Sequence, residues 1–114
     1  MNTAKVGWRT YKLVSITHEE AVERGNWGEH AGIVGEIRVA EDVAPQVQAA
    51  LLLHELLHAG CSVLSPPGTW DFKDVPLDDV EERVVDHVAT ILATLMRDNP
   101  KLFSRVLGDL EGDV

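Results

Sequence analysis

Apolar and polar residues follow two different periods along this chain, and together the periods predict both strands and helices. Residues 8–17 are rich in aromatic and β-branched side chains, and residues 33–39 alternate between an apolar and a polar side, so both segments are predicted to be strands. Thr17 and Glu20 have capping-box spacing, which predicts a short helix after the first strand. Residues 25–32 hold three glycines and are predicted to form a loop.

The second half of the chain is predicted to be helical. Residues 45–64 begin with a proline, which is favoured in a first helical turn, and are apolar nearly all round, so they predict the central buried helix. Residues 65–76 are rich in proline and predict a loop. Asp78 followed by Glu81 has the spacing of an N-cap and its N3 partner, which predicts a long helix from there to about residue 98.

Asn99 and Pro100 separate that helix from a last short one through residue 110. We therefore expect an α+β fold in which a small sheet of two or three strands lies beside a helical core. At 114 residues the chain is long enough for one domain with a modest core, so residues 1–114 are predicted to form a single domain.

Composition narrows the classes of function. The formal net charge of −9 argues against a nucleic-acid phosphate binder, which usually carries a basic patch. Cys61 is the only cysteine and has no partner for an internal disulfide, which favours a reducing compartment. The chain opens on no charged-then-apolar leader, and no uninterrupted apolar run approaches about 18 residues. We expect a cytoplasmic protein without nucleic-acid or membrane partners.

Candidate chemistry lies in the middle of the central helix, in the sequence His54-Glu55-Leu-Leu-His58. Residues i and i+4 of a helix lie about 40° apart around its axis and roughly 6 Å apart along it, so both imidazoles can bind one metal ion. Zinc suits such a pair. Glu55 points about 100° away from His54, where it can reach a water on the metal without becoming a ligand. The competing interpretation is a chance match in a buried helix.

A catalytic zinc ion usually has three protein ligands, so a third is needed. Cys61 lies about 10.5 Å along the helix from His54, too far to share a metal ion with it, and is better explained as a small buried apolar residue. The remaining candidates are carboxylates of the long second helix: Asp79, Glu81, Glu82 and Asp86. Glu81 and Glu82 also fit an acidic first turn that complements the helix dipole. A narrow face of that helix carries Glu82 and Asp86 together with Ala89 and Ala93. The small side chains of the two alanines would let another helix approach this face closely.

The motif, with Glu82-x-x-x-Asp86 following it by 24 residues, resembles the gluzincin type of zinc peptidase. In its small size the chain is similar to minigluzincins and to phage or mobile-element metallopeptidases of the ImmA/IrrE type. The resemblance implies that His54, His58 and Glu82 bind zinc and that Glu55 is the general base. It implies further that Asp86 is the hydrogen-bond partner of His54, and that residues 33–39 form the edge strand along which an extended peptide or protein substrate lies.

Three interpretations of function remain open at this level. The first is a zinc-dependent metallopeptidase that hydrolyses peptide bonds, for which Tyr11, His30 and His87 are the candidates for stabilising the oxyanion. The second is a non-catalytic, metal-stabilised binding or regulatory protein of phage or mobile-element type. The third is a metal-free domain in which the two motif histidines are simply packed. Glu55 favours the enzyme, because a structural zinc site has no use for a base.

Overall fold

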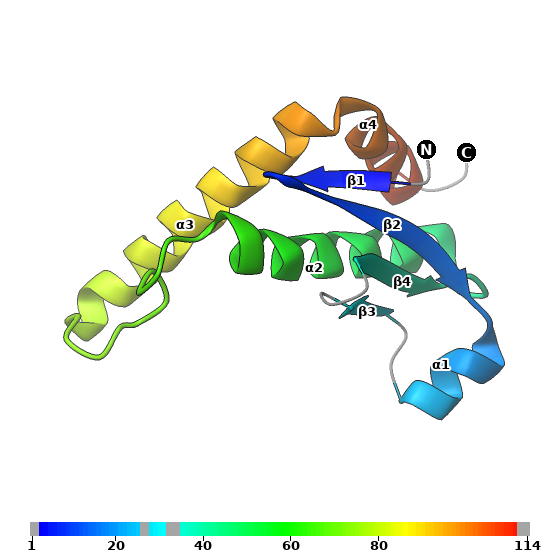
Figure 1. Ribbon diagram of the computed structural model, residues 1–114, viewed down its shortest axis with the longest axis horizontal. Coiled ribbons are helices and arrows are strands. Elements are labelled where there is room, and N and C mark those ends of the chain that lie inside the picture. Colours follow the sequence, from blue (N-terminus) through cyan, green and yellow to red (C-terminus); the bar gives the residue numbers. More distant parts are fainter. Residues whose placement is uncertain (1–2, 26–27, 32–34, 112–114) are drawn as a thin grey trace.

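The computed structural model describes residues 3–25, 28–31 and 35–111, and the strands and helices in these ranges confirm an α+β fold (Figure 1). The elements follow one another as β1 (Thr3–Val6), β2 (Arg9–Ile16), α1 (His18–Arg24), β3 (Gly28–Ala31), β4 (Glu36–Ala40), α2 (Pro45–Leu64), α3 (Leu77–Asp98) and α4 (Pro100–Leu110).

The strands form one mixed sheet in the order β1-β2-β4-β3. β2 and β4 are parallel, whereas β1 pairs with β2 and β3 pairs with β4 in antiparallel fashion. The sheet therefore has more strands than the two or three expected from the sequence. β1 and β3 are only four residues long, too short for alternation between apolar and polar residues to reveal them.

The predicted edge strand lies inside the sheet, so the prediction that residues 33–39 form the edge is wrong. Of that segment, residues 33 and 34 lie outside the described part of the chain, Gly35 lies in the turn before β4, and residues 36–39 belong to β4, which pairs with β2 on one side and with β3 on the other. The register sets Gly28 opposite Val39 and His30 opposite Ile37. The segment predicted to be a loop thus contains β3, which is the strand at this edge of the sheet.

The short helix α1 begins and ends as its sequence predicts. The Thr17 hydroxyl accepts a hydrogen bond from the Glu20 backbone N–H at 3.2 Å, and the Glu20 carboxylate accepts one from the Thr17 N–H at 3.4 Å. Gly25 ends the helix with a φ of +70°, a conformation that costs a glycine little because it has no Cβ.

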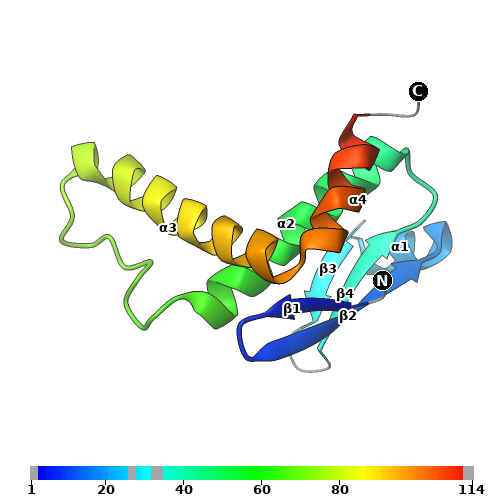
Figure 2. The same cartoon turned by 90° about the horizontal axis from the view of Figure 1, so that it is seen from above.

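Helix α2 is the centre of the domain and has the bounds that the sequence predicts (Figures 1 and 2). It contacts β1, β3 and β4 of the sheet as well as α3 and α4. Leu52, Leu56 and Ala59 are buried in the main apolar core. By length and composition α2 could also cross a membrane, and 33% of its most apolar stretch is buried within the fold.

Helix α3 starts differently from the prediction, although the loop before it and the end of the helix are as expected. Pro76 occupies the N-cap position without a side-chain hydrogen bond, and Asp78 lies inside the first turn. The predicted capping role of Asp78 is therefore wrong; its charge instead lies where it complements the helix dipole.

Close packing fixes the C-terminal half of α3. A Cβ atom at Gly60 of α2 would collide with the Ile91 side chain and contact that of Leu95, so α3 crosses α2 at a point where only glycine fits. At the end of α3, the Asn99 side chain accepts a hydrogen bond from the Lys5 N–H and donates one to the Lys5 carbonyl, both at 2.7 Å. These contacts tie α3 to α2 and to β1.

The N-terminal half of α3 projects from the domain together with the loop before it, as both views show (Figures 1 and 2). Ile91 and Leu95 are the buried residues of this helix, whereas Leu77 is 89% exposed and Val85 55% exposed. The radius of gyration is 15.2 Å, whereas a compact domain of this length would have about 13 Å. The projecting half of α3 accounts for this extended shape.

We predict that Gly60→Ala destabilises the fold by about 1–2 kcal/mol, because overpacking against Ile91 costs more than the helix propensity that alanine gains. Gly108→Ala in α4 is the matched control: its Cβ would meet no atom within 4 Å, so it should stabilise by up to about 1 kcal/mol. Urea denaturation of both variants measures the difference. Equal stability of the two variants would contradict the close crossing of α2 and α3.

Candidate metal centre

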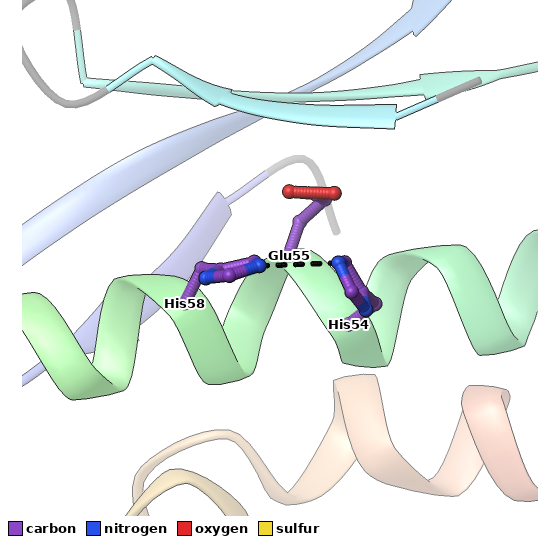
Figure 3. Close-up of side chains that lie close together, drawn as sticks. All are labelled: His54, Glu55 and His58. Carbon is purple, nitrogen blue, oxygen red and sulfur yellow. Dashed lines mark hydrogen bonds between the residues drawn. The ribbon is translucent and has the colours of Figure 1, made fainter. Parts of the chain in front are cut away.

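The two motif histidines lie side by side on α2, one helical turn apart (Figure 3). Nε2 of His54 and Nε2 of His58 are 3.1 Å apart, and the two rings meet edge to face with their centroids 4.6 Å apart. Both side chains are exposed. Burial of the Leu52 and Leu56 side of the helix leaves the histidines on its open flank.

The distance between the two nitrogens fits one shared zinc ion. Two nitrogen ligands at about 2.0–2.1 Å from a tetrahedral zinc lie about 3.3–3.4 Å apart. The observed 3.1 Å differs by a few tenths of an ångström, which small rotations of exposed imidazoles can supply. His54, Glu55 and His58 together form a group whose ligand atoms lie within 4.8 Å of one another and could hold a metal ion.

Glu55 differs from the histidines in its surroundings. Its side chain is 6% exposed and points from α2 toward the sheet, between the two imidazoles (Figure 3). Among the described residues, no hydrogen bond or ion pair of the Glu55 carboxylate is found. The carboxylate oxygens therefore keep contact with solvent, since no fully buried side-chain oxygen among the described residues lacks a hydrogen-bond partner.

The structure does not bring Glu82 and Asp86 to this group. Both lie exposed on α3, which meets α2 at Gly60, about 120–160° around the α2 axis from the two histidines. Gly60 of α2 faces Ile91 of α3. Leu64, four residues later on α2, lines the same small cavity as His87, four residues earlier on α3. The two helices therefore run in opposite directions. Glu82 therefore lies beyond the C-terminal end of α2, and its predicted role as third ligand stays a prediction.

Two other candidates for the third metal ligand, Glu81 and Cys61, are also separate from the histidines. Glu81 is exposed on the projecting part of α3, like Glu82. Cys61 packs against the main core, and burial raises the pKa of its thiol. A protonated thiol is a poor metal ligand, which agrees with the interpretation of Cys61 as an apolar residue.

None of the predicted oxyanion donors whose side chains are described lies beside the two imidazoles. Tyr11 is fully buried in the main core, with the guanidinium of Arg9 4.8 Å from its ring centroid. His87 meets Trp70 edge to face at 5.3 Å between ring centroids, at the base of the projecting loop. The side chain of His30 lies outside the described part of the chain.

β3 lies in a segment predicted to be a loop, although this strand contacts the helix that carries the motif. One signal could have revealed it. The signal is the glycine at position 35, directly before β4, because glycines are typical of the turns that join antiparallel strands. In the structure Gly35 has a φ of +67°, a conformation that favours glycine. A turn at this glycine implies a partner strand before it, next to the candidate site.

Comparisons of the chain with protein-family models, with curated proteins and with solved structures give no match. The function must therefore be argued from the chain's own residues and their geometry.

We predict that the zinc-reconstituted protein, prepared without a histidine tag, binds about one zinc ion per chain. His54→Ala and His58→Ala should each lose most of this zinc and its stabilising effect on the melting temperature. His18→Ala is the matched control, because His18 is exposed and pairs with Asp42 at 2.8 Å on another part of the molecule. Elemental analysis after dialysis measures the metal. Equal zinc content in wild type and His58→Ala would contradict the site.

Proposed function

We propose that this protein is a zinc-dependent metallopeptidase that hydrolyses peptide bonds. The observation that carries the proposal is the combination of two imidazole nitrogens 3.1 Å apart with a nearly buried carboxylate, that of Glu55 beside His54, which has no partner among the described residues. The first feature suits metal binding and the second suits proton transfer. A purely structural metal site needs only the first.

Each residue has a distinct task in this proposal. His54 and His58 hold the zinc, and Glu82 is the third ligand that the resemblance to gluzincins implies. The same resemblance makes Asp86 the partner of the second ring nitrogen of His54, which would fix the orientation of that ring. Bound zinc would supply Lewis-acid polarisation of the scissile carbonyl and a lowered pKa of the attacking water.

Glu55 is the proposed general base. Its carboxylate would accept a proton from the attacking water and deliver it to the leaving amine. The position of Glu55 supports this role, since its carboxylate lies between the two imidazoles on the side of the sheet, and ligand atoms of the three residues lie within 4.8 Å of one another (Figure 3). No partner among the described residues competes for the carboxylate.

A peptide or protein is the proposed substrate. β3 is the outer strand on one side of the sheet and contacts α2, so an extended chain could add to its free edge and pass close to the motif. The net charge of −9 continues to argue against nucleic-acid substrates. We propose a cytoplasmic enzyme without a membrane partner, in keeping with the single cysteine.

A second candidate is a metal-stabilised binding or regulatory protein without turnover. It is favoured by one observation: neither Tyr11 nor His87, the oxyanion candidates whose side chains are described, lies at the imidazoles. The two candidates differ in what Glu55 does, and a substitution at that residue separates them.

We predict that Glu55→Gln keeps the fold and the zinc but lowers peptide hydrolysis by at least about 10²-fold, because general-base catalysis contributes that much. Zinc-loaded wild type and variant would be incubated with unstructured proteins, and the fragments identified by mass spectrometry. Glu23→Gln, at an exposed position of α1, is the control for loss of a carboxylate elsewhere. Equal cleavage by all three would identify a contaminant, and no cleavage by zinc-loaded wild type would favour the binding protein.

A further inference from the structure

We propose that the metal centre is completed between two copies of this chain, with His54 and His58 from one copy and Glu82 from the other. The inference rests on the metal-binding part of the proposed function and adds a partner to it. The inference follows from the packing of α3 against Gly60 and from the exposure of two helix faces, the histidine flank of α2 and the Glu82 face of α3. It follows also from the matching one-turn spacing of the imidazoles and the carboxylates on these faces.

Within one chain, the packing of α3 keeps Glu82 away from the histidines. Glu82 lies nine residues before Ile91, which corresponds to about 13 Å along α3 from the crossing with Gly60. His54 lies six residues before Gly60 on α2, in the opposite direction, which adds about 9 Å. Delivering Glu82 within the chain would require α3 to leave Gly60 and to break the two hydrogen bonds between Asn99 and Lys5.

The flank of α2 around the histidines is exposed and, beside them, carries no acidic or basic side chain. Every fourth residue along it is exposed: Gln46, Ala50, His54, His58 and Ser62. In a chain with a net charge of −9, this is a stripe without a carboxylate, and its small residues let another helix come close.

A matching face lies on the projecting part of α3 and continues past it. Glu82, Asp86, Ala89 and Ala93 share one side of the helix, and all four are exposed. The two carboxylates are one turn apart, as are the two imidazoles. Antiparallel docking of this face on the α2 flank of a second copy would therefore set Glu82 at one histidine and Asp86 at the other.

The shape of the molecule suits such an exchange. The N-terminal half of α3 extends away from its own sheet, which leaves it accessible to a neighbour (Figure 2). A two-fold dimer would use the same pair of faces twice and form two centres, as isologous interfaces do. Because two acidic chains repel each other, the dimer should need the cation that Glu82 and the histidines share.

The first test is the oligomeric state by sedimentation in the absence and presence of zinc. We expect a monomer without zinc and a dimer with about one zinc ion per chain. A zinc-loaded monomer with one ion per chain would overturn the inference but leave the proposed metal site intact. Wild type that binds no zinc at all would instead reject the metal site itself, and the inference with it.

The second test is complementation between two defective variants, Glu82→Gln and His58→Ala. Each alone should bind little zinc, but a mixture unfolded and refolded together should form mixed dimers in which one centre has all three ligands. If the subunits mix at random, the mixture should recover about a quarter of a zinc ion per chain. A mixture of His54→Ala with His58→Ala is the control and should recover none, because every centre then lacks a histidine.

Glu81→Gln is the matched substitution on α3, one residue from Glu82 but on a different side of the helix. It should bind zinc and dimerise like wild type. Circular dichroism of each variant would establish that it is folded before its metal is measured. If the Glu82→Gln and His58→Ala mixture recovers no zinc while both variants are folded, or if Glu82→Gln keeps its zinc, the proposal of a shared centre is wrong.

Discussion

Burial of one side of α2 against the sheet is the constraint on which the site depends. Leu52, Leu56 and Ala59 are buried in the main core, and their burial fixes the rotation of the helix. Because each residue turns the helix by about 100°, the same rotation sets His54 and His58 on the open flank and Glu55 between that flank and the sheet. The packing of α2 thereby separates the two imidazoles from the Glu55 carboxylate, although candidate ligand atoms of all three residues lie within 4.8 Å of one another.

The same constraint explains why this helix tolerates polar groups that a packed core would not. The Glu55 side chain is 6% exposed, and its carboxylate has no hydrogen-bond partner among the described residues. The two imidazoles share one short contact, in which only one nitrogen can donate a proton to the other. A cation bound by the imidazoles, with a water near Glu55, would satisfy all three groups.

The periodicity of the sequence predicted those features of the site that depend on the geometry of a single helix. The i, i+4 spacing of His54 and His58 and the bounds of α2 follow from helical periodicity, which the apolar run displays clearly. β3 escaped prediction because four residues among glycines carry no periodic signal. Periodicity also identified the face of α3 that carries Glu82, but it cannot say which neighbour meets that face. The close contact of Gly60 with Ile91 determines the packing of α3, and it brings α3 against a side of α2 that does not carry the two histidines.

The most direct test of the account is X-ray absorption spectroscopy of the zinc-loaded protein, since it reports the atoms bound to the metal. We expect two imidazole nitrogens at about 2.0–2.1 Å, the remaining scatterers to be oxygen, and no sulfur. A zinc–sulfur distance near about 2.3 Å, which would implicate Cys61, or a shell without imidazole scattering would contradict a zinc centre built on His54 and His58.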